Sequence, residues 1–359
     1  MMLVVREADV YQILCDLSPQ QARRFLDTLS AALILYSKEN RFANREILLH
    51  QPSRTHIVNK HNDTALFMPS SDTQTNGIKL IALPSGGGTA GAIILFTPSG
   101  EITGMVGPSH MTAFRTALAT MTLFAKVRHI SKKNMVIFGS GRQVEWHLRL
   151  AFLLTAGEIE NVWIINRGRE RLDNLEKEVL STLRLTHANV SFHLIAKEDT
   201  PRYNEVLRAT LKSSDVIFCC TPSTSPLFPY SILRSSPKDR FISVIGSYKP
   251  HMREIDTETL LSGGGRVFVD SADECLEESG ELIDANVTKE ALIEIGEYLG
   301  SQCSGYPEGN VVLKCVGMGI MDLVSSRLLL ELAEECGVGQ QMLDAIGPFN
   351  PLVHNFFYG

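Results

Sequence analysis

The stretch that decides the fold is NMVIFGSGRQVEWHLRLAFLL, residues 134–154. Its first five residues are rich in β-formers, Gly139 and Gly141 make a tight turn, and an amphipathic helical pattern follows at once. Glycines at such a turn let the backbone approach a pyrophosphate, which then lies at the N-terminus of the helix. The stretch therefore predicts the first strand, turn and helix of a dinucleotide-binding sheet. Val144 departs from this fingerprint, because Gly or Ala is usual at its position.

Short β-rich runs alternate with helical patterns on the C-terminal side of this stretch. The further runs are 161–166, 189–196, 215–220, 241–246 and 266–270, and helical patterns lie at about 142–156, 169–183 and 202–212. This alternation is typical of a parallel, doubly wound sheet, so we predict an α/β fold of the Rossmann type.

The two ends of the chain have other patterns. The first ~35 residues favour a helix, and short extended runs between about 45 and 106 favour a mostly antiparallel sheet. An apolar helix is predicted at about 109–127, and a last amphipathic helix begins at about 318. We therefore predict a Rossmann domain over 126–317 and a smaller α+β domain built from 1–125 and 318–359.

The end of the second β-rich run, Asn166-Arg167, indicates which dinucleotide binds. NAD sites usually place Asp or Glu there to bind the 2′-hydroxyl of the ribose. Here the carboxylate is absent and a guanidinium is present, with Arg169 close by. A guanidinium suits a 2′-phosphate through charge-assisted hydrogen bonds, so we expect NADP(H).

The composition is that of an ordinary globular protein and excludes several classes. A net charge of −6 and a pI near 6.0 argue against nucleic acid or an anionic membrane as partner. No apolar run approaches the ~18–20 residues of a membrane-spanning helix, and the N-terminus does not resemble a secretory signal. The 7 cysteines show neither CxxC pairs nor neighbouring histidines, so we predict no disulfide scaffold and no metal site, and a cytoplasmic location.

Three cations in the first part of the chain stand out by their context. Arg115 lies in the apolar helical run AFRTALATM, where a charge needs a partner. Lys79 interrupts the apolar run GIKLIAL, and Arg45 precedes the apolar run ILL. Together they are suited to hold a carboxylate and to donate a proton. Each is also compatible with an edge position or an internal ion pair.

The chain resembles the ornithine cyclodeaminase/mu-crystallin family over nearly its full length. The motifs that carry the resemblance occur in order: LFMP followed by GIK, MTAFRTALAT, GSGRQ, INR, SDVIFCCTPS, IGSYKPHMREID, FVDS, ESGEL and LKCVGMGIMDL. The resemblance implies a Rossmann domain for the cofactor. It also implies a homodimer in which the small domain forms both the dimer contact and the substrate pocket.

Carried over to this sequence, the resemblance implies a role for each matching position. Arg45, Lys79 and Arg115 match the residues that handle the substrate carboxylate and the proton. The cofactor positions are Gly139, Gly141, Arg142 and Gln143 at the phosphates, Asn166 and Arg167 at the adenosine ribose, Thr221 and Pro222 at the nicotinamide ribose, and Ser247 and Val316 beside the nicotinamide.

Three departures from the family pattern bear on the reaction. Cyclodeaminases carry an Asp after the glycine that ends the run 241–246, whereas this chain has Ser247. The spacing that follows is closer to mu-crystallin and the ketimine reductases than to true cyclodeaminases. Cys315 and Met321 also replace the usual Ser and Glu, which affects the shape of the substrate pocket.

We therefore predict an oxidoreductase that acts on C–N bonds and uses NADPH to reduce the C=N bond of a cyclic ketimine carboxylic acid or a related imine. Arg45 and Arg115 would orient the substrate carboxylate, and Lys79 would give a proton to the imine nitrogen. Three alternatives stay open. They are an amino-acid dehydrogenase that works by reductive amination, a cyclodeaminase that recycles NAD, and a non-catalytic binder of NADPH and a small ligand, as in mu-crystallin.

Overall fold

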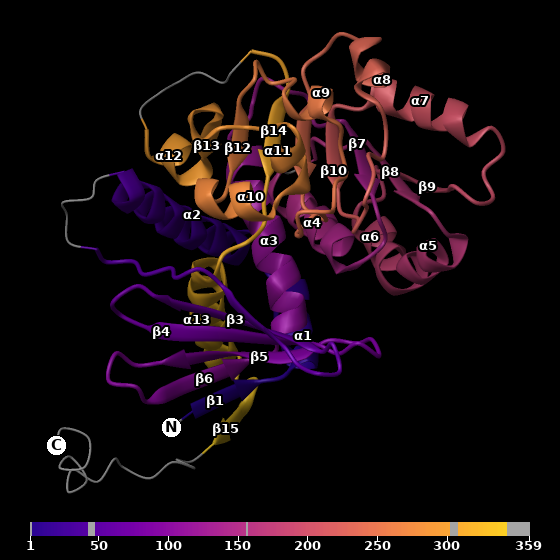
Figure 1. Cartoon of the computed structure of the whole chain (residues 1–359). Coiled ribbons are helices and arrows are strands. Elements are labelled where there is room, and N and C mark those ends of the chain that lie inside the picture. Colours follow the sequence, from indigo (N-terminus) through magenta and orange to yellow (C-terminus); the bar gives the residue numbers. More distant parts are fainter. Residues whose placement is uncertain (1, 42–46, 156, 302–307, 343–359) are drawn as a thin grey trace, which may run out of the picture.

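The computed structural model describes residues 2–41, 47–155, 157–301 and 308–342. These residues form two β-sheets, one parallel and one mixed (Figure 1). The inner strands of the parallel sheet come from buried runs rich in Val, Ile, Leu and Phe, whereas the edge strands of the mixed sheet are exposed. The α/β fold predicted from the sequence is therefore confirmed.

The parallel sheet has eight strands in the order β13-β12-β14-β11-β10-β7-β8-β9. Their bounds are β7 (Asn134–Phe138), β8 (Asn161–Asn166), β9 (Ser191–Ala196), β10 (Val216–Cys219), β11 (Phe241–Val244), β12 (Val267–Val269), β13 (Leu292–Glu294) and β14 (Val311–Lys314). The chain order reverses at β7, which has β8 on one side and β10 on the other. Ligands of open α/β sheets bind outside the carboxyl ends of the strands at such a reversal.

Helices cover both faces of the parallel sheet. Met135 and Ile137 join one buried apolar cluster, while Val136 and Phe138 join another, as the alternation of side chains along a strand requires. The helices are α4 (Arg142–Leu154), α5 (Arg169–Leu175), α6 (Ser181–Thr186), α7 (Tyr203–Ser213), α8 (Tyr230–Arg234), α9 (Thr257–Leu260), α10 (Ala272–Glu278), α11 (Gly280–Asp284) and α12 (Ile295–Gly300), with a π-helical turn at Glu176–Leu180 and a 3₁₀ turn at Lys289–Ala291.

The mixed sheet joins the two ends of the chain in the order β15-β1-β6-β5-β4-β3-β2. Its strands are β1 (Met2–Val5), β2 (Thr55–Val58), β3 (Thr64–Ser71), β4 (Asn76–Leu83), β5 (Ala90–Phe96), β6 (Ile102–Val106) and β15 (Gln340–Met342). The predicted helix at the N-terminus starts later than expected, since Met2–Val5 pair with both β6 and β15 before α1 (Glu7–Cys15) and α2 (Pro19–Arg41). Local periodicity does not show such a pairing, because the partners are distant in sequence.

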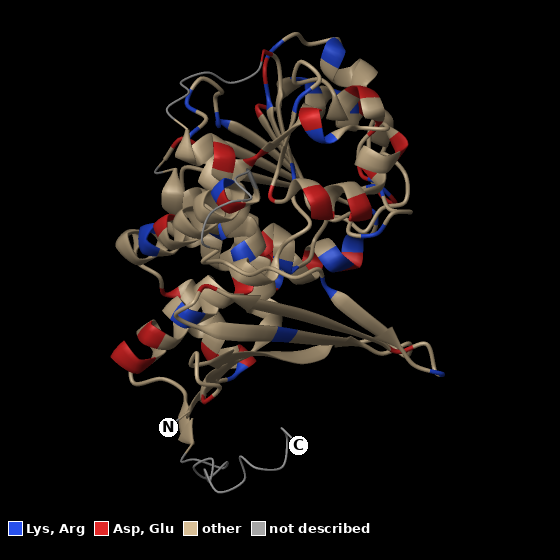
Figure 2. Cartoon of the chain, turned by 60° about the vertical axis from the view of Figure 1, so that its left-hand side comes forward, with Lys and Arg blue, Asp and Glu red and all other residues tan. Residues whose placement is uncertain are grey.

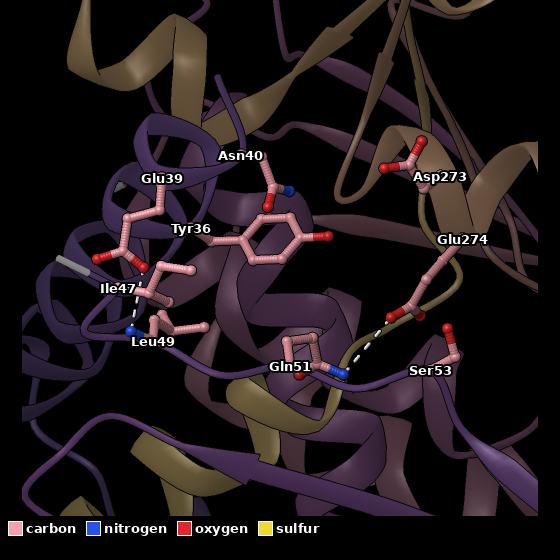
Figure 3. Close-up of a pocket in the computed structure, with 9 residues that line it drawn as sticks. All are labelled: Tyr36, Glu39, Asn40, Ile47, Leu49, Gln51, Ser53, Asp273 and Glu274. Carbon is pink, nitrogen blue, oxygen red and sulfur yellow. Dashed lines mark hydrogen bonds between the residues drawn. The ribbon is translucent and has the colours of Figure 1, made fainter. Parts of the chain in front are cut away.

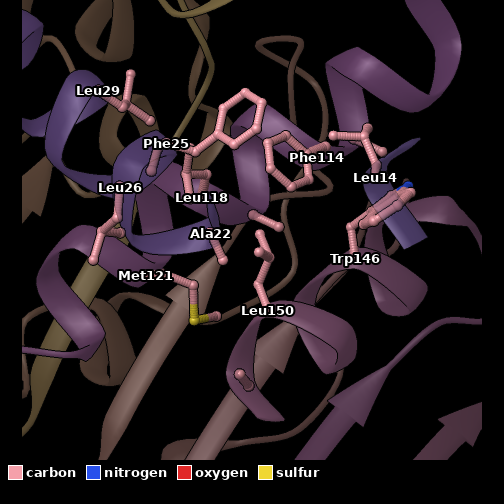
Figure 4. Close-up of a cluster of buried hydrophobic side chains, with 14 of the residues drawn as sticks. Leu14, Ala22, Phe25, Leu26, Leu29, Phe114, Leu118, Met121, Trp146 and Leu150 are labelled. Carbon is pink, nitrogen blue, oxygen red and sulfur yellow. The ribbon is translucent and has the colours of Figure 1, made fainter. Parts of the chain in front are cut away.

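Two apolar helices connect the sheets. These are α3 (Pro108–Phe124), which is buried along nearly its whole length, and α13 (Gly319–Glu335), which packs on β3, β4 and β5. Rings of Phe25, Phe114 and Trp146, from α2, α3 and α4, meet edge to face with centroids 5.0 and 5.5 Å apart (Figure 4). The core is therefore continuous between the two sheets. The predicted domain limits at 125/126 and 317/318 stay a proposal.

The two faces of the mixed sheet differ in what covers them. Gly77 and Gly104 lie under α13, where an added Cβ would come within 2.6 Å of Leu323 and 2.2 Å of Leu330. The opposite face, which we call the outer face, carries alternate apolar side chains that are only half-buried; they are Phe67, Ile78, Leu80, Ile94 and Phe96. Among the described elements, helices lie on the α13 side of this sheet (Figures 1 and 2).

None of the helices that the structure describes combines the length and the apolar character needed to cross a membrane. The cysteines within the described ranges are free thiols, and no cluster of three or more His, Cys, Asp or Glu side chains there is arranged to hold a metal ion.

Candidate functional site

Three buried charges meet at the junction of the two sheets. Lys79 comes from β4, Arg115 from α3 and Asp322 from the first turn of α13, and each is at most 3% exposed. The Lys79 ammonium donates to Oδ2 of Asp322 at 2.6 Å, and Nε of Arg115 donates to Oδ1 at 3.1 Å. Buried charges are tolerated only when they are paired in this way. The structure thus brings together two of the three cations that the sequence predicted.

The environment of Lys79 makes its proton available near neutral pH. Burial, followed by the positive charge of Arg115, lowers the pKa of Lys79 from 10.5 to about 8, although the carboxylate of Asp322 opposes this change. A proton donor works best when its pKa lies near the working pH. Lys79 is therefore suited to give a proton to a group that becomes more basic during a reaction.

A tight turn supports the guanidinium of Arg115. Gly317 has φ +86°, and a Cβ at this position would lie 2.0 Å from Nη1 of Arg115. Asp270, fully buried at the end of β12, accepts hydrogen bonds from the backbone N–H groups of Gly317 at 2.6 Å and of Val316 at 3.2 Å. The thiol of Cys315 donates to the same carboxylate at 3.2 Å. Only glycine fits this turn without displacing Arg115.

A cation that the sequence analysis did not single out also lies here. Nη2 of Arg54 donates to the carbonyl oxygen of Gly317 at 2.8 Å and to Oε2 of Glu274 at 3.0 Å, and its Nε lies 2.8 Å from Oε1 of Glu278. Its charge also helps to lower the pKa of Lys79. Arg54 stands in the polar stretch PSRTH, so no apolar context draws attention to it. The predicted Arg45 lies outside the described residues.

A cavity of about 230 Å³ opens beside Arg54, between the end of α2, the strand-like segment 47–53 and the start of α10 (Figure 3). Tyr36, Asn40, Gln51 and Glu274 line it among other residues. Gln51 links the cavity to α13, because its Oε1 accepts a hydrogen bond from the backbone of Ile320 at 2.7 Å. The lining of the cavity is mostly polar, and Glu274 connects it to Arg54.

The glycine turn after β7 has the geometry that a pyrophosphate needs. Gly139 has φ +114°, and a Cβ there would lie 2.8 Å from the carbonyl oxygen of Cys220, whereas Gly141 faces open space. α4 begins at Arg142, which is exposed, and Oε1 of Gln143 is buried without a hydrogen-bond partner. Exposed donors at a helix N-terminus and an unsatisfied polar atom fit an anionic group bound at this turn.

Val144, the departure from the fingerprint, is accommodated without loss of the turn. Its side chain is fully buried at the start of α4. Its Cγ2 lies 3.4 Å, an ordinary contact distance, from the position of a Cβ at Gly139. The valine therefore packs against the first glycine of the turn.

The end of β8 presents one exposed cation. Nδ2 of Asn166 donates to the carbonyl oxygen of Gly168 at 2.9 Å, which fixes this turn. The guanidinium of Arg169 is paired with Asp199 at 2.7 Å, so it is already engaged. Arg167 lies exposed between the two. Of Arg167 and Arg169, Arg167 is thus the better placed for a 2′-phosphate.

A buried carboxylate ties the ends of β10 and β11 together. Glu254 accepts hydrogen bonds from the N–H and hydroxyl of Thr221 at 2.6 and 2.7 Å and from the N–H of Gly246 at 2.6 Å. Burial raises the pKa of Glu254 from 4.5 to about 7. Pro222 follows Thr221 and is exposed. The two loops beside the predicted nicotinamide position are therefore held as one unit.

Ser247 is engaged in a second buried network. Its hydroxyl donates to Oε1 of Glu281 at 2.6 Å and accepts from the Lys314 ammonium at 2.6 Å. All three side chains are at most 3% exposed. A hydroxyl held between a fixed donor and a fixed acceptor is unsuited to serve as a base.

The predicted cofactor positions share one edge of the parallel sheet. Each lies at the carboxyl end of a strand or within three residues after it; they are Gly139 (β7), Asn166 (β8), Thr221 (β10), Ser247 (β11) and Val316 (β14). α13 starts three residues after Val316 and carries Asp322. The charged cluster therefore lies at the same edge as the cofactor positions, which is the arrangement that a reaction between cofactor and substrate requires.

No family model matches the chain. The chain is 28% identical to an uncharacterised protein of Saccharomyces cerevisiae, over 92% of this chain and 96% of the yeast protein. It is 26% identical to a Δ1-pyrroline-2-carboxylate reductase of Bacillus thuringiensis, over 80% of this chain and 86% of that protein. Rat ketimine reductase mu-crystallin is 23% identical, over 78% of this chain and 84% of the rat protein.

Solved structures agree with these relatives. The Δ1-pyrroline-2-carboxylate reductase of Thermococcus litoralis, in complex with NADH and L-proline, has a TM-score of 0.76 at 21% identity and covers 95% of this chain and 100% of its own. A probable ornithine cyclodeaminase of Bordetella pertussis has a TM-score of 0.72 at 20% identity, with the same coverage. An archaeal alanine dehydrogenase dimer with bound NAD has a TM-score of 0.75 at 17% identity, over 96% and 99% of the two chains. The chain is thus similar over most of its length to Δ1-pyrroline-2-carboxylate reductases and to ketimine reductase mu-crystallin, and it shares its fold with these solved structures.

The named relatives share one type of chemistry. The bacterial and rat relatives are named as reductases of C=N compounds, and two of the solved structures named above hold NADH or NAD. Reductases and a probable cyclodeaminase both match the chain, so the ketimine-reductase type stays a proposal.

Gly317→Ala tests the support of Arg115. We expect this change to cost more stability than the ~1 kcal/mol of an ordinary Gly→Ala exchange at positive φ, because the methyl group also collides with the guanidinium. Gly337→Ala is the matched control, since Gly337 has φ +65° but open space around its Cβ position. Thermal unfolding of both variants makes the comparison. Equal losses would contradict the contact between Gly317 and Arg115.

Proposed function

We propose that this protein is an NADPH-dependent reductase of imines that carry an adjacent carboxylate, such as cyclic ketimine acids. The observation that carries the proposal is the buried cluster of Lys79, Arg115 and Asp322 at the cofactor edge of the parallel sheet. It combines a proton donor with a carboxylate-binding guanidinium and contains no nucleophile. That combination suits hydride addition to a C=N bond.

The substrate carboxylate is bound by arginine. The Nη groups of Arg115 lie close to Gly317, and its Nε donates a hydrogen bond to Asp322. Arg54 donates to the carbonyl oxygen of Gly317 and contributes a second guanidinium. Arg45 remains part of the proposal as a further carboxylate-binding residue. Guanidinium groups bind carboxylates in a fixed plane, which orients the neighbouring C=N bond.

Lys79 provides the proton. A bound nicotinamide cofactor supplies a hydride to the imine carbon. As the negative charge develops on the imine nitrogen, Nζ of Lys79 gives its proton to that nitrogen and becomes a neutral amine. Asp322 and Arg115 keep Nζ within the site during this step. The surrounding burial excludes water, so the proton comes from the protein rather than from solvent.

The cofactor is held along the carboxyl edge of the parallel sheet. We assign its phosphates to the turn of Gly139, Gly141, Arg142 and Gln143, its adenosine ribose phosphate to Asn166 and Arg167, and its nicotinamide half to Thr221, Pro222, Ser247 and Val316. The positive φ of Gly139, the unsatisfied Oε1 of Gln143 and the exposed Arg167 support this assignment.

Deamination of the cyclodeaminase type is less well supported. It needs a base at the position of Ser247, where the hydroxyl is instead held between Lys314 and Glu281. Reduction needs no base there. A non-catalytic binder would keep the same cofactor edge, and the experiment below distinguishes it from an enzyme.

Lys79→Met tests the proton donor and the proposed activity together. With NADPH and Δ1-pyrroline-2-carboxylate, we expect kcat of the parent protein to fall as pH rises above about 8, since Lys79 loses its proton there. Lys79→Met should lower kcat by about 10²–10⁴-fold with little change in NADPH affinity. Lys133→Met, which removes an exposed lysine paired with Glu160, is the control. Normal kcat per folded site in Lys79→Met would remove Lys79 from the mechanism, and no turnover by the parent on any imino acid would favour the binder.

Arg167→Asp tests the cofactor. We expect the parent protein to bind NADPH more tightly than NADH, and the variant to lose about 1–3 kcal/mol of that preference with the charged hydrogen bonds. Arg208→Asp, an equal charge change on an exposed site of α7, should leave the preference unchanged. Fluorescence titration with both nucleotides gives the dissociation constants. Equal affinities in the parent would refute the assignment of NADP(H).

Ile94→Lys tests the predicted homodimer. We propose that two copies associate through the outer face of the mixed sheet, because its apolar row is half-buried and Figure 2 shows few charges on these strands. A lysine at Ile94 would put a charge in that contact, so sedimentation at micromolar concentration should show a monomer. Leu185→Lys, at an exposed leucine on α6, should remain a dimer. A monomeric parent protein would overturn this proposal.

A further inference from the structure

We propose that Asp322 is a positioning residue, which fixes the Lys79 ammonium and the Arg115 guanidinium relative to each other and keeps the ammonium protonated. This inference rests on the proposed function, since it assigns to Asp322 a part in the chemistry of Lys79. Its basis is geometric, because each carboxylate oxygen of Asp322 binds a different cation. Oδ2 accepts from Lys79 at 2.6 Å, and Oδ1 accepts from Arg115 at 3.1 Å.

The backbone around Asp322 is fixed on two sides. The start of α13 is tied down because the N–H of Ile320 donates to Gln51 at 2.7 Å. Gly319 packs against β3, where a Cβ would lie 3.2 Å from the carbonyl oxygen of Met68. Met68 is the direct partner of Lys79 across the β3–β4 pair. The carboxylate and the ammonium are therefore held on neighbouring, closely packed segments rather than on flexible ones.

The carboxylate of Asp322 also balances the positive charges around Lys79. Lys79 faces Arg115 from α3, Asp322 from α13 and, further away, Arg54 from the segment before β2. Arg54 is offset by Glu274 and Glu278. One negative and two positive charges remain at the centre, which leaves a net positive charge for a substrate carboxylate. Without Asp322, two buried cations would repel each other, and the lysine is the one that can lose its proton.

If Asp322 had only a structural role, the expected result would be different. A structural carboxylate would affect only folding, and the folded fraction of a variant would work normally. A positioning carboxylate also sets the protonation of Lys79, so its loss changes the pH at which the site works. The pH dependence of kcat therefore separates the two roles.

The experiment compares Asp322→Asn and Asp322→Glu with the parent protein. An asparagine offers one carbonyl oxygen and turns its NH₂ toward the other cation. In Asp322→Asn we expect kcat to fall at least tenfold and the basic limb of its pH profile to move down by about one unit or more. Asp322→Glu keeps the charge but moves it, so the limb should stay within about half a unit while kcat falls.

Asp215→Asn is the matched control. Asp215 is also a buried, ion-paired aspartate, bound to Lys238 at 2.7 Å, but it lies at the opposite, amino-terminal edge of the parallel sheet. Loss of the Asp215 carboxylate should lower the melting temperature without shifting the basic limb of the pH profile of kcat. An unchanged limb and normal kcat per folded site in Asp322→Asn would overturn the proposal. If that variant does not fold, normal kcat in Asp322→Glu would overturn it instead.

A second measurement does not depend on turnover. Calorimetry of pyrrole-2-carboxylate binding in the presence of NADP⁺, in buffers of different ionisation enthalpy, counts the protons taken up with the ligand. At pH 7 we expect little uptake by the parent and about half a proton or more per site in Asp322→Asn, because the bound anion would restore the charge of Lys79. Equal uptake in both proteins would contradict the role of Asp322. Binding by a parent protein that reduces no imine would refute the proposed function alone.

Discussion

The structure depends most on the burial of two cations around one carboxylate. Removing Lys79 and Arg115 from water is costly, and the cost is offset only where Asp322 reaches both. Because the three residues lie on β4, α3 and α13, the mixed sheet and both connecting helices have to meet at one place. Gly77 and Gly104 permit this by letting α13 lie close on the sheet. The same arrangement that satisfies these charges also joins the two sheets.

Buried carboxylates also shape the rest of the site. Asp270 holds the turn of Val316 and Gly317, and Glu254 holds the loops after β10 and β11, each by accepting backbone N–H groups. Carboxylates make strong hydrogen bonds to such donors and can join two segments at once. The loops at the carboxyl edge contain little helix or strand. These carboxylates therefore accept the backbone hydrogen bonds that a strand or helix would otherwise satisfy. The proposed substrate and cofactor positions are thereby kept in register.

The site shows why some residues could be predicted and others could not. Arg115 and Lys79 stood out because each interrupts an apolar run, and a charge in such a run needs a partner. Arg54 gave no such signal, since its neighbours in sequence are polar and its partners, Glu274 and Glu278, are more than 200 residues away. Asp322 was part of a family motif, but nothing in its local pattern said that it would bind two cations. Val144 departs from the usual fingerprint, and its side chain is fully buried at the start of α4.

The sequence by itself determined the class of fold and the order of its parts. The alternation of β-rich runs and helices, and the glycines at 139 and 141, specify a parallel sheet with a phosphate turn, because periodicity and backbone freedom are local properties. Tertiary structure alone decided that Met2–Val5 form a strand between β6 and β15, and that one carboxylate serves two cations. Both outcomes depend on partners more than 100 residues apart, and the free energy of such a pairing comes from burial and charge, which no local pattern encodes.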